Sequence, residues 1–397
     1  MILTNYKGND IIKPIGFILS VTYFILTYVT YINPQYQILI TYNLYALCAL
    51  ALIYTVLQQK ISYNIYLKYF LLFFIVTFIF SVLPHIGSTY YNTVIKSTLD
   101  ILNILILTYC FSLFINQKDL KNILIVISIS SILSFIFTGN NFDIYSGERF
   151  GNELAGNANI ISSLYMIAAI ASTYCIFNNK NILLKLLFCL LFCVQIFAII
   201  LTGSKKALVI PILFFALYFI LTRKKKAYAA STLVIVIAFC YFLYFALYNI
   251  PLIYDLIGYR FEGMISAFTN NQGDASTMER INMIHDALDF WQTKPLCGIG
   301  LNLFSEKSIY GTYSHNNYVE LLSTTGLIGC ISYYVIHFKL LKRIMPYLVI
   351  QKQDAAFYFL LIICLLIFDI GAVSYKYSLI QAVLSLCGIY CNNITSK

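Results

Sequence analysis

His315 is the side chain in this sequence best suited to exchanging a proton near neutral pH beside a membrane. It stands in the stretch GTYSHNNYVELLSTTGLIG, residues 311–329, just before a long apolar segment begins. Asn316 and Glu320 are four residues apart, so on a helix they share one face close to His315. A neutral imidazole held there could take the proton of a hydroxyl group. A structural interpretation stays open, in which His315 caps the helix and Glu320 only makes a loop more polar.

A second polar group is basic and follows an apolar segment in the order Thr202-Gly203-Ser204-Lys205-Lys206. Two adjacent cations beside a glycine, a serine and the start of a helix form a plausible anion site. The alternative is that both lysines snorkel to the membrane interface. Positive charge is disfavoured in short loops on the outer side of a membrane, which favours the anion site.

Three arginines, Arg149, Arg260 and Arg280, lie in the loops that flank these groups. A guanidinium can hold a phosphate or pyrophosphate in forked geometry. Each of the three also has a glutamate close by in the sequence with which it could pair instead. Together with the two lysines, the arginines predict an electropositive cleft on one face of the molecule.

Several motifs of other chemistries are absent from the sequence. It contains no DxD pair, no Walker loop, no GxSxG and no HExxH. Phosphate held by Arg and Lys fits a lipid-linked pyrophosphate better than a metal-bound nucleotide. We therefore expect group transfer that requires no metal ion and no cofactor.

The composition defines the elements that must position these residues. Of 397 residues, 60% are hydrophobic and only 11% are charged, and the mean hydropathy is +0.80. An ordinary soluble domain is about 25% charged, and a membrane-spanning helix needs roughly 20 mostly apolar residues. The chain is therefore predicted to be an all-α polytopic membrane protein with about twelve transmembrane helices. We place these helices at about 14–33, 37–57, 67–84, 97–115, 121–138, 158–177, 182–201, 207–222, 229–250, 316–338, 355–371 and 376–391.

The spans divide the chain into three parts. Residues 1–250 carry the first nine helices, residues 251–315 form one large loop, and residues 316–397 carry the last three. Within the loop, residues 277–290 place apolar side chains at helical spacing, which predicts an amphipathic helix along the membrane face. Pro295 and the pair Gly298 and Gly300 then end that helix.

The distribution of charge sets the expected orientation. The net charge is +10, but no basic domain is present that could bind nucleic acid. With both termini in the cytoplasm, most of the 26 basic residues fall on the inner side, including the run Arg223–Lys226. The large loop, His315 and the arginines then lie outside. We expect a multi-pass protein of a bacterial inner membrane, in contact with membrane lipids.

Several of these residues together resemble the hallmark region of the O-antigen ligase/polymerase superfamily, which is of the GT-C type. The resemblance consists of an arginine that begins a loop helix, a Pro-x-x-Gly-x-Gly turn, a His-Asn pair and a Gly-x-x-Gly. In this chain these are Arg280, then Pro295 to Gly300, then His315-Asn316, then Gly326 and Gly329. The element TGSKKA resembles the family's T-x-S-R-G, with Lys205 in place of arginine and Lys206 in place of glycine. The stretch GERFGNELAGNAN, which holds Arg149, is also similar to a segment of the family.

The resemblance implies an inverting glycosyltransferase that uses undecaprenyl-pyrophosphate-linked glycans. It gives His315 the role of general base toward the acceptor hydroxyl, with Asn316 and Glu320 orienting it. Arg280 would act in catalysis on the departing pyrophosphate. The binding of that pyrophosphate falls to Lys205 and Lys206 with Arg149 and Arg260.

Two activities share this scaffold, and the sequence favours the first. A polymerase joins lipid-linked repeat units into O-antigen or capsule, together with a chain-length regulator protein. A ligase transfers the finished polymer to lipid A–core. Glu320, five residues after His315, is more typical of polymerases. A glycolipid flippase without chemistry is the alternative from another class, but it would need charges spread along the spans.

Overall fold

The computed structural model describes residues 9–31, 34–59, 61, 63–139, 149–151, 158–222, 234, 237–238, 241, 244–246, 248–270, 275–350 and 352–394. Over these ranges the chain is helical and contains no strand. Nine of the helices in the described part are long and apolar enough to cross a membrane, and two shorter apolar helices follow them. The prediction of an all-α polytopic membrane protein is confirmed.

The long helices agree closely with the predicted spans. In the first half they are α1 Asn9–Thr30, α2 Gln37–Gln58, α3 Ile65–Thr77, α4 Tyr91–Phe114, α5 Leu120–Gly139, α7 Ala158–Asn178, α8 Ile182–Leu201 and α9 Lys205–Thr222. In the second half they are α15 Asn317–Ile344, α16 Lys352–Phe368 and α17 Ser378–Ile394. The predicted ninth span, 229–250, and the basic run Arg223–Lys226 lie largely or wholly outside the described residues.

Helix α7 lies at the centre of the bundle. It packs against α5, α8 and α9, and 83% of the residues in its most apolar stretch are buried inside the protein. Small side chains such as Ala168 and Ala171 let the neighbouring helices approach closely. Between these helices Ser172 donates a hydrogen bond to Gln195 (2.8 Å), a polar contact that holds α7 to α8.

Helix α15 is broken at Gly326, where φ is +67°, and a turn from the preceding loop fills the break. The backbone N–H groups of Leu327 and Ile299 donate to Pro295 O (2.9 Å) and Ser323 O (2.8 Å). A Cβ on Gly326 would overlap the carbonyl of Leu296, so only glycine fits. The Pro-x-x-Gly-x-Gly turn and the later glycine are therefore two halves of one joint.

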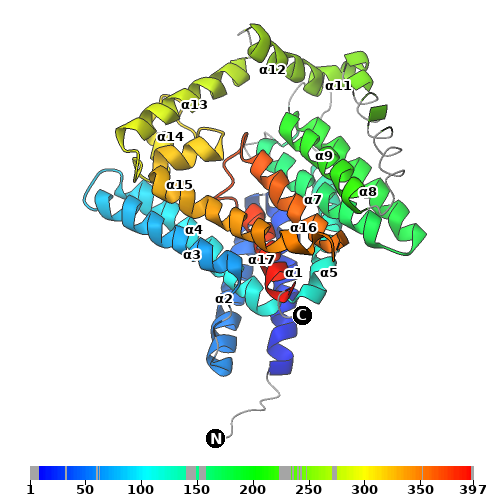
Figure 1. Cartoon of the computed structure of the whole chain (residues 1–397), viewed down its shortest axis with the longest axis horizontal. Helices are drawn as coiled ribbons and strands as arrows, with labels where there is room; N and C mark the ends of the chain where they lie inside the picture. Colours follow the sequence, from blue (N-terminus) through cyan, green and yellow to red (C-terminus); the bar gives the residue numbers. More distant parts are fainter. Residues whose placement is uncertain are drawn as a thin grey trace, which may run out of the picture.

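The large loop forms a chain of short helices, α11 Pro251–Ile253, α12 Tyr259–Asn270, α13 Ala275–Thr293 and α14 Leu303–Lys307. Figure 1 shows α11, α12 and α13 arching over the end of the molecule that lies away from the N-terminus. The predicted helix at 277–290 is observed as the middle of α13, which packs along α15. Short helices were also expected elsewhere in this loop, but without bounds, and α12 is one of them.

The two last helices are short because the connection between them folds back into the protein. Helices of 17 residues are about 25 Å long, less than the roughly 30 Å of a bilayer core. Ala372, Val373 and Ser374 of the connection are almost completely buried. This buried connection is hydrogen-bonded to the start of α15, next to His315.

Candidate functional site

His315 lies at a sharp bend directly before α15. Its φ of +56° is in the left-handed region, which a non-glycine residue adopts only when its surroundings hold it there. The cap of α15 is Asn316, whose side-chain oxygen accepts the N–H groups of Tyr318 (2.9 Å) and Val319 (3.3 Å). Because Asn316 performs the capping, the imidazole of His315 is not needed for it.

Glu320, in the first turn of α15, supports the same bend. It is completely buried, and its Oε2 accepts a hydrogen bond from the backbone N–H of Ser314 (2.8 Å). The hydroxyl of Ser314 in turn donates to Asn316 O (3.1 Å). Glu320 and Asn316 therefore fix the backbone on both sides of His315. Because Glu320 acts on the backbone of the bend, this geometry makes it a positioning residue.

The imidazole is half-buried among aromatic and cationic side chains. The ring centroids of His315 and Tyr313 are 4.5 Å apart, and Lys376 Nζ lies 4.9 Å from the centroid of the Tyr313 ring. Burial, followed by the charges of Arg280, Lys206 and Lys376, lowers the pKa of His315 to about 3. His315 is therefore neutral in the ligand-free protein, with a lone pair available to accept a proton.

Asn317 fastens the buried connection between α16 and α17 to this bend. Its backbone N–H and its Nδ2 donate to Asp369 O (2.8 Å) and Asp369 Oδ2 (3.1 Å). Its Oδ1 accepts the N–H of Ser374 (3.0 Å). Burial raises the pKa of Asp369 to about 7, while hydrogen bonds and the charge of Lys206 oppose that rise. Sequence reasoning missed both Asn317 and Asp369.

The turn between α8 and α9 gathers two arginines around one glycine. Gly203 has φ +62°, and a Cβ there would lie 3.4 Å from both Arg149 Nε and Arg260 Nε. Arg149 donates from Nε to Thr202 O (2.7 Å) and from Nη2 to Asn159 Oδ1 (3.2 Å). Arg260 Nε is buried without a hydrogen-bond partner among the described residues. Two guanidinium groups so close together repel each other unless an anion joins them.

The two lysines extend this group toward His315. Lys205 Nζ donates to Arg260 O (2.8 Å) and Thr277 Oγ1 (3.4 Å). Lys206 Nζ donates to Gly371 O and lies 4.8 Å from the centroid of the Phe368 ring. The partners named here are carbonyls, a hydroxyl and a ring, and the charge of Lys206 also acts on the carboxylate of Asp369.

Arg280, in the first turns of α13, links the cations to the imidazole. Its charge lowers the pKa of His315. The pKa of Arg149 is lowered to about 10, first by burial, then by the charge of Arg260 and then by that of Arg280. Glu262, the glutamate nearest in sequence to Arg260, instead accepts the hydroxyl of Tyr254 (2.7 Å). The structure thus brings together predicted site residues from distant stretches of the chain. We define the cation cluster as Arg149, Lys205, Lys206, Arg260 and Arg280.

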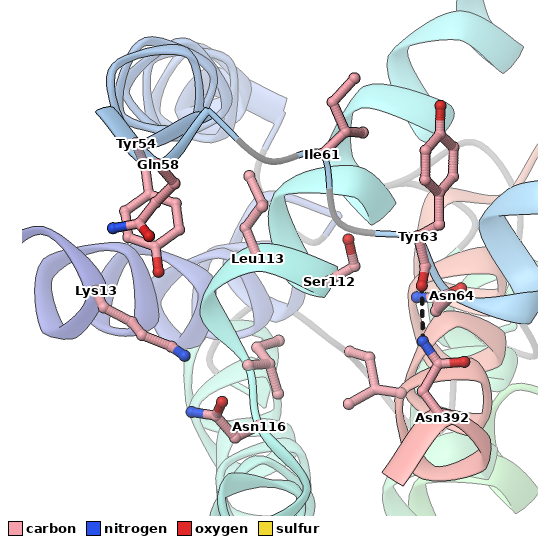
Figure 2. Close-up of a pocket in the computed structure, with 12 residues that line it drawn as sticks. Lys13, Tyr54, Gln58, Ile61, Tyr63, Asn64, Ser112, Leu113, Asn116 and Asn392 are labelled. Carbon is pink, nitrogen blue, oxygen red and sulfur yellow. Dashed lines mark hydrogen bonds between the residues drawn. The ribbon is translucent and has the colours of Figure 1, made fainter. Parts of the chain in front are cut away.

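Two cavities help to place this site in the molecule. One of about 510 Å³ is lined by Lys13, Asn64, Asn116 and Asn392 (Figure 2). It lies where α1 and α3 begin and α4 and α17 end, at the opposite end of the bundle from His315. A second, of about 270 Å³, is lined partly by Lys376 and therefore lies beside the histidine. Within the described residues no group of three or more His, Cys, Asp or Glu could hold a metal ion.

One family of known proteins is similar to the middle of this chain. Residues 186–334 match the model of the O-antigen ligase family. The match includes Arg280, His315 and Glu320, whereas Arg149 and its partner Asn159 precede it. The resemblance to the O-antigen ligase/polymerase superfamily that the sequence motifs indicate is confirmed over these residues.

A curated relative of this chain is the ComP-specific O-oligosaccharyltransferase of Acinetobacter baylyi. The two are 27% identical over 296 residues, which cover 66% of this chain and 51% of the relative. The chain thus spans about half the length of the relative that it matches.

Proposed function

We propose that this protein transfers an oligosaccharide from an undecaprenyl-pyrophosphate donor to an acceptor hydroxyl at the outer face of a bacterial inner membrane. The observation that carries the proposal is the position of a neutral His315 beside the cation cluster. A base for a hydroxyl and a site for a pyrophosphate are the two groups that this transfer requires.

The reaction is a single displacement at the anomeric carbon of the donor sugar. The acceptor oxygen forms a bond to that carbon while the bond from the carbon to the pyrophosphate oxygen breaks. His315 takes the proton of the acceptor hydroxyl, and the lipid pyrophosphate leaves with the electron pair of the broken bond. Because the attack comes from the side opposite to the leaving group, the product has the inverted configuration.

The cation cluster has two effects on this step. Its lysines and arginines stabilise the negative charge that grows on the departing pyrophosphate, which requires no metal ion. The pyrophosphate, once bound, offsets the charges of Arg280 and Lys206 that hold down the pKa of His315. His315 therefore becomes a better base only when the donor is in place. Without the donor, the imidazole stays unprotonated and does not take a proton from water.

Two kinds of acceptor are consistent with this chemistry. The sequence favours a polymerase, whose acceptor is another lipid-linked repeat unit and whose partner is a chain-length regulator. The ligase alternative, transfer to lipid A–core, is favoured by the family description of residues 186–334. The relative from Acinetobacter baylyi is described as specific for ComP. In each case both termini of this chain would be cytoplasmic, with the cation cluster outside.

Deletion of the gene, followed by gel analysis of the surface polysaccharide, separates these functions. A single repeat unit on the lipid core identifies a polymerase. Bare core with polymer retained on the lipid carrier identifies a ligase. Normal core with repeat units left on the inner leaflet would contradict both and identify a flippase. Complementation with His315→Ala should fail although the variant is produced at normal levels.

A further inference from the structure

A cavity of about 270 Å³ opens beside His315, between the outer end of α4 and the buried connection of α16 to α17. Its wall includes Asp100, Glu306, Lys96, Lys376 and Tyr375. We propose that this cavity binds one sugar ring of the acceptor glycan, an assignment that rests on the transferase function proposed above. We refer to it as the α4 cavity.

Two side chains, Lys376 and Tyr313, connect the lining of the α4 cavity to the imidazole of His315. Lys376 lines the cavity and donates a hydrogen bond to Asn302 Oδ1 (3.2 Å), which is also in the lining. The same ammonium lies 4.9 Å from the centroid of the Tyr313 ring, and that ring is 4.5 Å from the imidazole of His315. With one ring of the acceptor bound in the cavity, the next sugar of the same glycan would extend past these side chains toward the base.

The charges in the lining favour a neutral ligand rich in hydroxyl groups. Asp100 and Glu306 accept hydrogen bonds, while Lys96 and Lys376 donate them. A hydroxyl group can donate to a carboxylate and accept from an ammonium at the same time. A polyanion would be repelled by the carboxylates and a polycation by the ammonium groups. The cation cluster on the other side of His315 has the opposite preference, since it is suited to an anion.

Tyr375 gives a second and independent indication of a ligand. Its side chain is 1% exposed and lines the cavity, and its hydroxyl has no hydrogen-bond partner among the described residues. A buried hydroxyl without a partner is rare because it loses its bonds to water and gains nothing in return. A sugar ring that enters the cavity and displaces the Tyr375 ring slightly would supply the missing partner.

The size of the cavity limits the ligand to a single ring. Sites for drug-sized ligands usually have about 300–1,000 Å³, and the α4 cavity is slightly smaller than that range. One sugar ring fits such a space, whereas a whole repeat unit does not. The rest of the acceptor would extend away from the cavity, past Glu306 and Thr93, whose side chains are joined by a hydrogen bond (3.2 Å).

The test measures binding of methyl glycosides to the full-length protein in detergent by saturation-transfer NMR. The probes are the methyl glycosides of glucose, galactose, N-acetylglucosamine and N-acetylgalactosamine, with inorganic pyrophosphate as a separate probe of the cation cluster. Ser97→Tyr fills the cavity from α4, and Thr93→Val removes one hydroxyl without a change of shape. Leu99→Phe is the matched control, because Leu99 is on the same helix but 49% exposed, away from the lining.

We expect at least one glycoside to give a saturable signal that falls at least about tenfold in Ser97→Tyr. Thr93→Val should weaken that signal, and Leu99→Phe should leave it unchanged. Pyrophosphate binding that persists in Ser97→Tyr shows that the variant is folded.

The proposal is overturned if no glycoside binds, or if Ser97→Tyr leaves glycoside binding intact. A short serine-containing peptide is tested as a probe of another ligand class. The proposal is also overturned if this peptide binds, its binding is lost in Ser97→Tyr, and no glycoside binds. Glycoside binding without any pyrophosphate binding would instead contradict the proposed transferase function and leave the cavity as a sugar site with no acceptor role.

Discussion

The carboxylate of Glu320 accepts a hydrogen bond from the backbone N–H of Ser314 at 2.8 Å, and this contact fixes the residue directly before His315. Glu320 is completely buried one turn inside α15. A buried carboxylate is costly unless it is hydrogen-bonded. Its Oε1 has no hydrogen-bond partner among the described residues, so the carboxylate lies here at a cost in stability while its Oε2 fixes the bend at residues 314–316.

Removal of the Glu320 carboxylate should slow transfer without a change in donor binding. Glu320→Ala leaves the Ser314 N–H unpaired, which costs about 1–3 kcal/mol, and lets the bend relax. We expect kcat to fall at least about tenfold with the donor KM unchanged. Glu320→Gln keeps an acceptor oxygen and should restore much of the rate. Equal losses in both variants would mean that the charge acts directly in catalysis.

Substitution of Gly203 should disturb the two arginines as well as the backbone. Gly203→Ala places a Cβ 3.0 Å from Leu256 O and 3.4 Å from Arg149 Nε and Arg260 Nε. Gly311→Ala is a matched control, since Gly311 has the same φ of +62° but nothing within 4 Å of the new Cβ. Both variants carry the backbone cost of about 1–2 kcal/mol. Only Gly203→Ala should weaken pyrophosphate binding measured by calorimetry, and equal weakening in both would contradict the proposed arginine site.

Loss of a guanidinium from the cation cluster should weaken donor binding in a salt-dependent way. A hydrogen bond to a charged group contributes about 1.5–3 kcal/mol, so Arg260→Gln should raise the donor KM by about tenfold or more. Lys339→Gln, near the far end of α15, is the control and should have no effect. The loss should shrink at high salt because the wild type itself then binds more weakly. A fall in kcat with an unchanged KM would place Arg260 outside the donor site.

The pKa of His315 should rise when an anion binds. In the free protein it is about 3, owing to burial and to the charges of Arg280, Lys206 and Lys376. A bound pyrophosphate offsets those charges, so imidazole NMR should show an upward shift, with His315→Gln used to assign the signal. Lys206→Met should raise the pKa without any ligand. An unchanged value with saturating pyrophosphate would contradict the arrangement.

The same depressed pKa has a consequence for stability. An unfolded histidine has a pKa of about 6.5. Between that pH and about pH 3, the unfolded state therefore binds a proton at His315 that the folded state does not bind. This contribution to stability is fully present above about pH 6.5 and is lost as the pH falls toward 3. Acid unfolding of His315→Gln should therefore be less steep across that range than that of the wild type.

Much of this arrangement could be predicted from sequence because it depends on local patterns. Apolar runs of the correct length indicated the spans, and helical spacing of apolar residues indicated α13. What could not be predicted depends on contacts between distant residues. Asn317 and Asp369 are 52 residues apart, and no pattern in either segment indicates their pairing. One usable signal is Asp369 itself, since an aspartate two residues before a glycine and between two apolar helices seldom lies at such a place without a function.

The joint between residues 295–300 and the break in α15 illustrates the same limit. Sequence reasoning recognised the turn and Gly326 as parts of a motif, but it could not show that they contact each other. The structure gives the physical reason, since a Cβ on Gly298 would overlap the backbone of Thr324. Each glycine is thus required by the backbone of the other segment.

The role of His315 as the base of a glycan transfer is tested most directly by single-turnover transfer with purified His315→Gln. The assay uses lipid-linked repeat units and follows the loss of the donor, with pyrophosphate binding measured in parallel. We predict that transfer falls by about a hundredfold or more while pyrophosphate binding persists. Transfer at the wild-type rate with intact pyrophosphate binding would contradict this role.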